Sequence, residues 1–385
     1  MQDDHPFPVT RIGLVGGGQL GRMLVKAAKQ LGCTCVVLDP TPNSPAGQLA
    51  TRQIVGSLHD ADCLRALAAD TDVITYEIED IDTETLAELA AAGHRIHPAP
   101  ALVAVVQDKL EQKRLLAKAG IATAEFREVA TPDPRQFQDF GYPLVQKARR
   151  GGYDGRGVAI LRSATDFEEH LPVPSLIERF VPAQKEIAVL VARGTNGETR
   201  CYPPVEMTFR TGENVLDLLL APAEVAPDTA SQAHDLAVRT VEALHGVGVF
   251  GVEMFLTEDG DLLVNEVAPR THNSGHHTIE ACVTDQFEQH LRAVIGLPLG
   301  STGQLSPAAM LNLLGEPDYA GRPVIRGLSE ALAIPGVCVH IYGKAQTRPF
   351  RKMGHVTVLD PDLNKARDKA NRVRQCLHII GEDTL

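Results

Sequence analysis

The chain has 385 residues, too many for one ordinary hydrophobic core, so two or three domains are expected. Hydrophobic residues make up 44% and charged residues 22%, a balance typical of a globular protein rather than a disordered one. The formal net charge of −12 argues against a broad nucleic-acid surface, and no apolar run approaches the length of a membrane span.

The N-terminal residues are acidic and lack the apolar core of a signal peptide. The 7 cysteines are scattered and include no Cys-x-x-Cys pair. We therefore expect buried free thiols and a cytoplasmic protein.

Residues 11–107 alternate between strand-like and helix-like segments, which predicts a parallel α/β unit. The expected strands are 11–15, 35–38, 53–55 and 73–77. A glycine motif, Gly16-x-Gly18-x-x-Gly21, follows the first strand, and Asp39 ends the second. This pattern is typical of a dinucleotide site, but a lone glycine fingerprint is weak because many folds begin this way.

The predicted secondary structure changes twice along the rest of the chain. A polar helix is expected from Gln107 to Ala119, followed by an α+β region that runs to about residue 297. The segment 297–303 has the composition of a linker. Beyond it we expect strands near 308–313, 337–342 and 354–359 and a charged helix from about 362. The predicted domains are 1–107, 108–297 and 298–385.

A predicted hairpin brings two carboxylates together. Strand-like residues 249–257 and 262–267 flank Asp259-Gly260, a preferred centre for a two-residue turn. That turn places Glu253 directly opposite Glu266, where two like charges are destabilising unless something neutralises them. A divalent cation such as Mg²⁺ is the favoured explanation, and a solvated acidic pair is the alternative.

The loop that follows this hairpin is rich in groups that contact anions. It contains Arg270, His272, Asn273, His276 and His277 between Pro and Gly residues. Zinc is disfavoured because no third ligand has the usual spacing, so substrate contacts are the favoured interpretation.

Three further segments carry polar groups suited to nucleotide or phosphate. Lys147 precedes a stretch with four glycines in seven residues, whose N–H groups can lie on phosphates. Glu178 and Glu186 lie on either side of a short connection between two predicted strands. Taken alone, these two acids could simply be exposed to solvent. The basic run 344–355 is either a solvated loop or a phosphate pocket.

Taken in order, these segments resemble the ATP-grasp superfamily and, more closely, the N5-carboxyaminoimidazole ribonucleotide synthetases of purine biosynthesis. The motifs are "GGGQLGRM", "KARRGGYDGRG", "NEVAPRTHNSGHHTIEA" with "QFEQHLRA", and "FRKMGHVT", and the resemblance runs from residue 11 to about 360. Phe350 stands where the family often has glycine, and we expect no consequence for the anion-binding side chains around it.

The resemblance implies a fold of α/β and α+β parts. These are an N-terminal Rossmann-like parallel domain, a central ATP-grasp domain and a small β-rich C-terminal domain. It also implies that the glycine turn helps to form the ribonucleotide site and binds no dinucleotide. ATP and Mg²⁺ are the expected cofactors, and NAD, biotin and zinc are not expected. The expected partners are aminoimidazole ribonucleotide and bicarbonate, with no nucleic acid or membrane, and a homodimer is plausible.

The resemblance also assigns roles to residues. ATP is expected to contact Lys109, Lys147, Tyr153, Glu178, Arg179, Val181, Glu186 and Asn265, and Mg²⁺ to lie on Glu253 and Glu266. The ribonucleotide is expected to contact Gln19, Glu77, Tyr153, Lys344 and Arg351. The reaction centre is expected to contain Asp154, Arg270, His272 and Asn273, with Asp154 orienting or deprotonating the amine.

The implied reaction joins bicarbonate to the exocyclic amine of the ribonucleotide, with ATP supplying the driving force through carboxyphosphate. Mg²⁺, lysines and an arginine are the groups that stabilise charge on phosphoryl and carboxyl oxygens. Three alternatives remain open at this point: another ATP-grasp carboxylate–amine ligase, a Rossmann NAD(P)-dependent oxidoreductase and a non-catalytic nucleotide-binding regulator.

Overall fold

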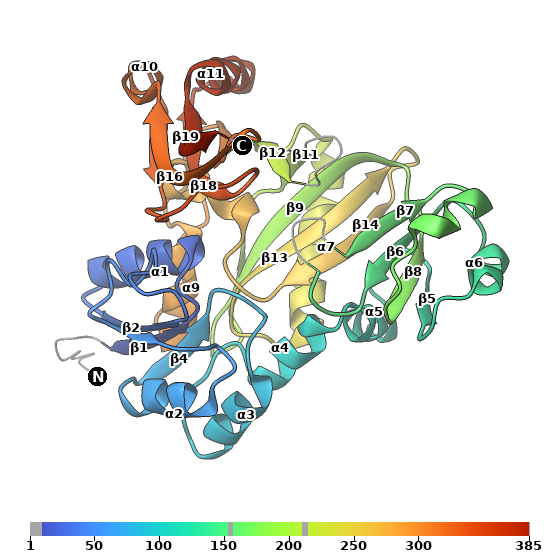
Figure 1. The fold of residues 1–385 in the computed structure, drawn as a ribbon, viewed down its shortest axis with the longest axis horizontal. Helices are drawn as coiled ribbons and strands as arrows, with labels where there is room; N and C mark the ends of the chain where they lie inside the picture. Colours follow the sequence, from blue (N-terminus) through green and yellow to red (C-terminus); the bar gives the residue numbers. More distant parts are fainter. Residues whose placement is uncertain (1–9, 153–156, 210–214, 385) are drawn as a thin grey trace.

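The computed structural model describes residues 10–152, 157–209 and 215–384 of the chain. In Figure 1 the N-terminal unit and the C-terminal unit lie on one side, and the central sheets extend away from them to the other. This arrangement confirms the expected parallel α/β domain, central α+β region and small C-terminal part.

The N-terminal unit is a parallel sheet covered by helices, as predicted. Its strand order is β3–β2–β1–β4, formed by β1 (Arg11–Val15), β2 (Thr34–Asp39), β3 (Arg52–Val55) and β4 (Val73–Tyr76). Its helices are α1 (Gln19–Gln30), α2 (Ala61–Ala69) and α3 (Thr83–Ala91). Leu20, Met23 and Leu24 bury one face of α1, and the chain turns after this helix at Gly32, which has φ +73°.

The predicted polar helix from Gln107 is wrong at its start. The structure has two helices here, α4 (Pro100–Gln107) and α5 (Lys109–Lys118), separated by Asp108. Asp108 has extended backbone angles, and its carboxylate accepts a hydrogen bond from the Leu110 N–H. An N-cap residue of this kind interrupts the helical pattern, and Pro100 begins α4 at a position where helices tolerate proline.

The central domain contains two sheets, a smaller one at the right of Figure 1 and a larger one to its left. The smaller is antiparallel with order β5–β8–β6–β7, built from β5 (Phe126–Val129), β6 (Leu144–Ala148), β7 (Val158–Leu161) and β8 (Ser175–Arg179). Helix α6 (Pro134–Phe140) and a short 3₁₀ helix (Ala164–Glu169) pack beside it.

The larger sheet runs in the order β14–β13–β9–β11–β12–β15–β18–β17, with β10 paired to β9. Its central-domain strands are β9 (Ala183–Arg193), β10 (Thr199–Cys201), β11 (Val205–Phe209), β12 (Leu216–Ala221), β13 (Gly248–Thr257) and β14 (Leu262–Ala268). Helix α7 (Pro227–Leu244) buries its apolar face against β9 and β13. A second 3₁₀ helix (Asn273–Gly275), α8 (Thr278–Ala281) and α9 (Gln286–Ile295) follow β14.

The C-terminal part continues the larger sheet and does not form a separate one. Strands β15 (Ala308–Leu314), β17 (Val337–Ile341) and β18 (Lys352–Leu359) lie near the predicted positions, and β15 pairs directly with β12. Helix α11 (Leu363–Cys376) covers them, as predicted. Because hydrogen bonding passes from β12 to β15, the boundary at 297/298 is not marked by a break in the sheet, and the domain limits remain predictions.

The C-terminal part also contains a ribbon and a short helix that were not predicted. Strand β16 (Tyr319–Arg326) pairs with β19 (His378–Thr384), and α10 (Leu328–Leu332) follows β16. Gly321 and Pro323 interrupt the alternating pattern of β16, and its partner is distant in the chain. Among the helices of the described residues, none is long and apolar enough to cross a membrane.

Candidate active site

The hairpin of β13 and β14 places two carboxylates opposite one another. The predicted pairing of Glu253 with Glu266 is confirmed. The predicted turn is wrong: Leu256 pairs with Leu262, so the loop is one residue longer than a two-residue turn, with Gly260 at φ +87°. A register shift after Glu253 then restores the predicted pairing, so two departures from the expected register cancel.

Each of these two carboxylates has a cationic or imidazole partner on the chain. Lys109 Nζ lies 2.6 Å from Glu266 Oε2, and His272 Nε2 lies 3.2 Å from Glu253 Oε1. The Lys109 ammonium lowers the pKa of Glu266 to about 2, against the opposing effect of burial. The like-charge repulsion expected from the sequence is therefore relieved within the protein itself.

A third acid, Glu178 on β8, is buried between two lysines. Its Oε2 lies 2.8 Å from Lys147 Nζ and its Oε1 lies 3.2 Å from Lys113 Nζ. Burial raises the pKa of Glu178, but the charges of Lys147 and Lys113 outweigh it and hold that pKa below its ordinary value. Both carboxylate oxygens of Glu178 thus already have lysine partners. The predicted contact of Glu178 with adenine remains a prediction.

Lys113 was missed by the sequence analysis. It is 3% exposed, it also contacts Thr123, and burial lowers its pKa to about 8. The available signal was helical spacing, because Lys109 and Lys113 lie four residues apart and share one face of α5. Lys147 Nζ also donates a hydrogen bond to the amide oxygen Oδ1 of Asn265 at 2.8 Å, so Asn265 joins the cluster of acids and lysines described above.

Glu186 lies in β9 beside this cluster, in register with Phe255 of β13. Burial, followed by the nearby charge of Glu253, raises the pKa of Glu186 to about 7. The predicted contact of Glu186 with a ribose remains a prediction.

The other predicted nucleotide contacts lie at the end of β8. Arg179 Nη2 is 3.3 Å from Glu125 Oε2 and its guanidinium lies over the Phe140 ring, while the Val181 carbonyl accepts from the Ala183 N–H. Tyr153 and Asp154 lie outside the described residues.

The loop after β14 joins the central domain to the N-terminal unit. Arg270 Nε lies 2.8 Å from Glu79 Oε1, and the His272 ring contacts Ser274 as well as Glu253. Both side-chain polar atoms of Asn273 are buried, and neither has a hydrogen-bond partner among the described residues. Buried polar atoms without partners are costly, so Asn273 has the character of a ligand contact.

The glycine turn is already occupied by acidic side chains of the chain. The Glu77 carboxylate accepts from the Gly18 N–H at 2.5 Å and from the Gly21 N–H at 2.8 Å, and Asp39 accepts from the Gly17 N–H at 2.8 Å. These are the N–H groups that a dinucleotide pyrophosphate would need. Gln19, the first residue of α1, is half-buried beside them.

The basic run 344–355 lies at the tip of the β17–β18 hairpin. The register of this hairpin ends with Ile341 paired to Gly354, and both Lys344 and Arg351 lie in the loop between β17 and β18. Arg351 Nη1 donates to the Gln346 carbonyl, and burial lowers the pKa of this arginine. Gln48 of the N-terminal unit donates to the Gly343 carbonyl at 2.8 Å, so the hairpin tip lies against the glycine-turn domain.

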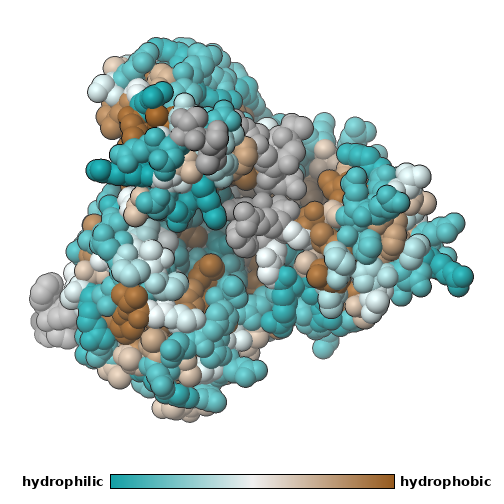
Figure 2. Space-filling view, in the orientation of Figure 1, coloured by the Kyte–Doolittle hydropathy of each residue, from teal (hydrophilic) through white to brown (hydrophobic). Residues whose placement is uncertain are grey.

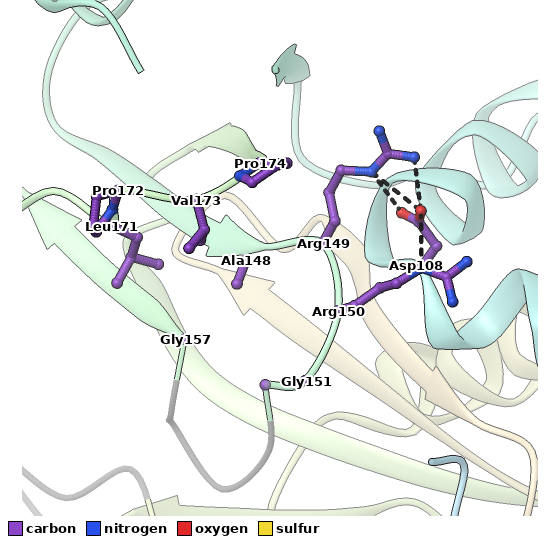
Figure 3. Close-up of a pocket in the computed structure, with 11 residues that line it drawn as sticks. Asp108, Ala148, Arg149, Arg150, Gly151, Gly157, Leu171, Pro172, Val173 and Pro174 are labelled. Carbon is purple, nitrogen blue, oxygen red and sulfur yellow. Dashed lines mark hydrogen bonds and ion pairs between the residues drawn. The ribbon is translucent and has the colours of Figure 1, made fainter. Parts of the chain in front are cut away.

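The molecular surface is hollowed where the three parts of the chain meet, and hydrophilic residues border much of this hollow (Figure 2). A separate open cavity of about 700 Å³ lies at the end of β6, lined by Asp108, Arg149, Arg150, Gly151 and the segment 171–174 among others (Figure 3). The described residues contain no group of three or more His, Cys, Asp or Glu side chains placed to hold a metal.

Comparison with known families matches all three parts of the chain. Residues 9–107 match the ribonucleotide synthetase preATP-grasp domain, 114–287 the ATP-grasp domain, and 308–369 the phosphoribosylaminoimidazole carboxylase C-terminal domain. The fold and the arrangement of lysines and acids thus define an ATP-grasp enzyme.

The chain belongs to the N5-carboxyaminoimidazole ribonucleotide synthase family. It is 42% identical to the synthase of Synechococcus elongatus over 361 residues, which cover 91% of this chain and 90% of that protein. The crystal structure of the Thermotoga maritima synthetase is 49% identical, with a TM-score of 0.91 over 97% of this chain and 100% of that one. The Aspergillus clavatus synthase, solved with ADP and 5-aminoimidazole ribonucleotide, is 36% identical, with a TM-score of 0.87 over 95% and 98% of the two chains.

Proposed function

We propose that this protein carboxylates the exocyclic amine of 5-aminoimidazole ribonucleotide to N5-carboxyaminoimidazole ribonucleotide, using ATP and bicarbonate. The overall reaction consumes one ATP, one bicarbonate and one ribonucleotide, and it releases ADP and phosphate. The observation that carries the proposal is the likeness to the Aspergillus clavatus synthase, whose crystal structure contains ADP and this ribonucleotide.

The cluster of lysines and acids supports a phosphoryl-transfer step. Bicarbonate oxygen attacks the γ-phosphorus of ATP, ADP leaves, and carboxyphosphate forms. The amine nitrogen then bonds to the carboxyl carbon, the phosphate leaves, and the amine gives up a proton. Lys109 and Lys147 carry the positive charge that stabilises the phosphoryl oxygens, and Glu186 accepts from the ribose hydroxyls.

The donor set at the hairpin fits Mg²⁺. Glu253 and Glu266 are paired across two strands and Asn265 directly precedes Glu266, so this part of the hairpin carries carboxylate and amide oxygens. Two carboxylates together with substrate phosphates make a typical Mg²⁺ site, and the ion would supply electrostatic stabilisation of the phosphates. In this arrangement a phosphate oxygen replaces part of the contact that Lys109 makes with Glu266.

The ribonucleotide is proposed to lie between the N-terminal unit and the β17–β18 hairpin. Lys344 and Arg351 bind its 5′-phosphate, and Arg270, His272 and Asn273 surround the amine. Asp154 takes or orients the amine proton in this proposal. Homodimer formation and a cytoplasmic location, implied by the family resemblance, remain predictions.

Phosphate release is the direct test of this function. We expect release with ATP, Mg²⁺ and bicarbonate to depend on added 5-aminoimidazole ribonucleotide, and to give one N5-carboxyaminoimidazole ribonucleotide per phosphate. Ribonucleotide-independent release, or activity with a different amine only, would favour another ATP-grasp ligase. Micromolar binding of NAD(P)H, measured by fluorescence, would favour the oxidoreductase alternative instead.

A further inference from the structure

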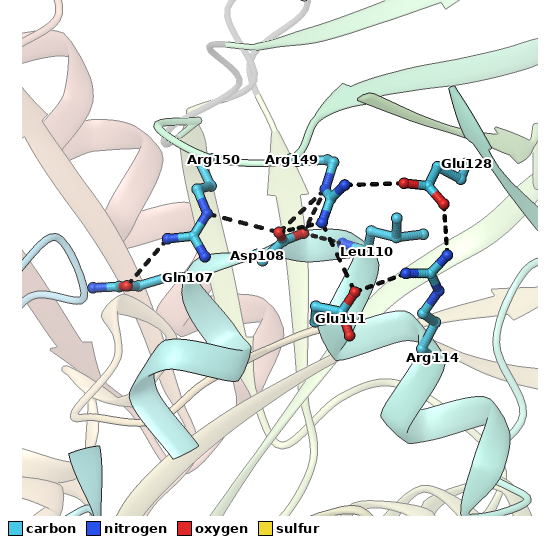
Figure 4. Close-up of polar contacts among 8 residues, drawn as sticks. All are labelled: Gln107, Asp108, Leu110, Glu111, Arg114, Glu128, Arg149 and Arg150. Carbon is cyan, nitrogen blue, oxygen red and sulfur yellow. Dashed lines mark hydrogen bonds and ion pairs between the residues drawn. The ribbon is translucent and has the colours of Figure 1, made fainter. Parts of the chain in front are cut away.

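An ion pair outside the acid cluster joins the two elements that carry its lysines. Asp108, which is 4% exposed, accepts from Arg149 Nε at 3.0 and 3.1 Å and from Arg149 Nη2 at 2.7 Å. Figure 4 shows this fork meeting the carboxylate at the point where α4 ends and α5 begins. Burial raises the pKa of Asp108, but the hydrogen bonds and charge of Arg149 outweigh it and keep that pKa below its ordinary value.

The backbone strengthens the same connection. The Lys109 N–H donates to the Arg149 carbonyl at 2.9 Å, so residues 108 and 109 are both bound to residue 149. Lys109 begins α5 and reaches Glu266, whereas Lys147, two residues before Arg149 on β6, reaches Glu178 and Asn265. The distance between the two lysines therefore depends on how α5 is held against β6.

Further charged side chains contact the Asp108–Arg149 pair and one another. Arg149 Nη1 lies 3.0 Å from Glu128 Oε1, and Arg114 contacts Glu128 at 2.6 Å and Glu111 at 2.8 Å (Figure 4). All three guanidinium nitrogens of Arg149 thus face carboxylates of the chain. An arginine with its donors used in this way positions other groups and is not the group that contacts phosphate.

We propose that Asp108 and Arg149 are positioning residues of the nucleotide-phosphate site, holding Lys109 and Lys147 at the separation at which both contact one polyphosphate chain. This inference rests on the proposed function only in taking the polyphosphate to be that of ATP. A bidentate fork fixes both distance and angle between α5 and β6, which a single ammonium does not.

Three variants test the pair. Asp108→Asn keeps a residue that caps helices well, so it removes the charged pair while preserving the start of α5. Arg149→Lys keeps the charge and removes the fork, and the double variant measures the coupling between the two positions. Arg114→Lys is the matched control, since this arginine of α5 also bridges two acids, Glu111 on α5 and Glu128 on β5, but contacts neither Asp108 nor the acid cluster.

The readouts are ADP affinity by calorimetry with Mg²⁺, the Michaelis constants for ATP and ribonucleotide, and the thermal midpoint. We expect each single variant to weaken ADP binding and raise KM for ATP about ten-fold, equivalent to about 1.4 kcal/mol, with KM for the ribonucleotide unchanged. The double variant should be no worse than either single one. Arg114→Lys should bind ADP as the unsubstituted protein does.

Two results would overturn the inference. If Arg149→Lys loses affinity while Asp108→Asn binds ADP normally, the arginine contacts the nucleotide directly. If both variants bind ADP within two-fold of normal and only the thermal midpoint falls, the pair is purely structural. ADP binding is measured without ribonucleotide, so a failure of the carboxylation assay in the unsubstituted protein is distinguishable from a failure of this inference.

Discussion

At the scale of single residues, two acids of the cluster have counter-charges on the chain before any ligand binds. Glu266 has Lys109, and Glu178 has Lys113 and Lys147, whereas Glu253 has the His272 imidazole as its neighbour. Nearby lysines hold the pKa of Glu266 and of Glu178 below its ordinary value. These two acids and their lysines are therefore paired in advance, and the polyphosphate and cation proposed above would exchange partners with them.

The first prediction concerns Glu266. We expect Glu266→Gln to reduce phosphate release at least ten-fold at limiting Mg²⁺, because the cation loses one of two carboxylates. The variant should also be slightly less stable without ligand, because Lys109 loses its partner. Magnesium titrations of phosphate release and chemical unfolding measure the two effects. Glu258→Gln in the exposed turn of the same hairpin is the control, and near-normal activity of Glu266→Gln at limiting Mg²⁺ would refute the metal assignment.

The second prediction concerns pH and Glu186. Its pKa is raised to about 7 in the folded protein, from an ordinary value of 4.5, so ionised Glu186 destabilises the fold above pH 7. As the pH falls from 7 towards 4.5, the folded protein takes up this proton first and the cost disappears. Glu186→Gln should therefore stabilise the ligand-free protein by about 3 kcal/mol at pH 8 and by almost nothing at pH 4.5, while weakening ATP binding. Equal gains in unfolding midpoint at both pH values would contradict the assigned cause.

At the scale of elements, the β13–β14 hairpin places Glu253 opposite Glu266. Its longer turn depends on Gly260 at φ +87°, and the register shift after Glu253 compensates for the extra residue. A Cβ at Gly260 would meet no atom within 4 Å, so a substitution there tests backbone conformation alone. A substitution at Gly260 therefore measures the free-energy cost of the backbone conformation without a change in packing.

The third prediction follows from this turn. We expect Gly260→Ala to lower the free energy of unfolding by about 1 kcal/mol, because alanine disfavours the left-handed region, and Gly260→Asn to cost less. Activity should be retained in both variants, since the acid pair lies six or more residues away along each strand. Denaturant unfolding with both variants measures the difference, and an equal cost for alanine and asparagine would contradict the conformational explanation.

Much of the fold could be predicted because its signals are local. The parallel strands of the N-terminal unit and α1 follow from periodicity within short segments. The predicted pairing of Glu253 with Glu266 is correct only because the longer turn and the register shift compensate for one another. The features that were missed depend on contacts between distant segments. The burial of Lys113 depends on its contact with Glu178 of β8, and β16 depends on its partner near the C-terminus. Glu77 was predicted as a site residue, but its hydrogen bonds to the glycine turn were not.

At the scale of the whole molecule, the three parts of the chain share one hydrophobic cluster. Leu20 and Met23 of α1, Phe287 and Leu291 of α9, and Tyr342 beyond β17 pack together. The cluster fixes the N-terminal unit against the β17–β18 hairpin, and the Gln48 contact to Gly343 lies beside it. The ribonucleotide site proposed between these parts would therefore lie at a preformed interface, separate from the lysines proposed to contact ATP.

The last prediction tests this separation of the two substrates. Lys344 and Arg351 both lie in the loop between β17 and β18, so they can converge on a dianionic phosphate, and each charge-assisted hydrogen bond contributes roughly 1.5–3 kcal/mol. Arg351→Ala should raise KM for the ribonucleotide by one to two orders of magnitude, at about 1.4 kcal/mol per ten-fold, and leave KM for ATP within two-fold. The nucleoside that lacks the 5′-phosphate should be equally poor with both proteins. Arg348→Ala, an exposed arginine three residues away, is the control and should change neither constant. If Arg351→Ala loses ATP affinity, or still prefers the phosphorylated substrate as strongly as the unsubstituted protein, the hairpin serves ATP or is a solvated loop, and the ribonucleotide lies elsewhere.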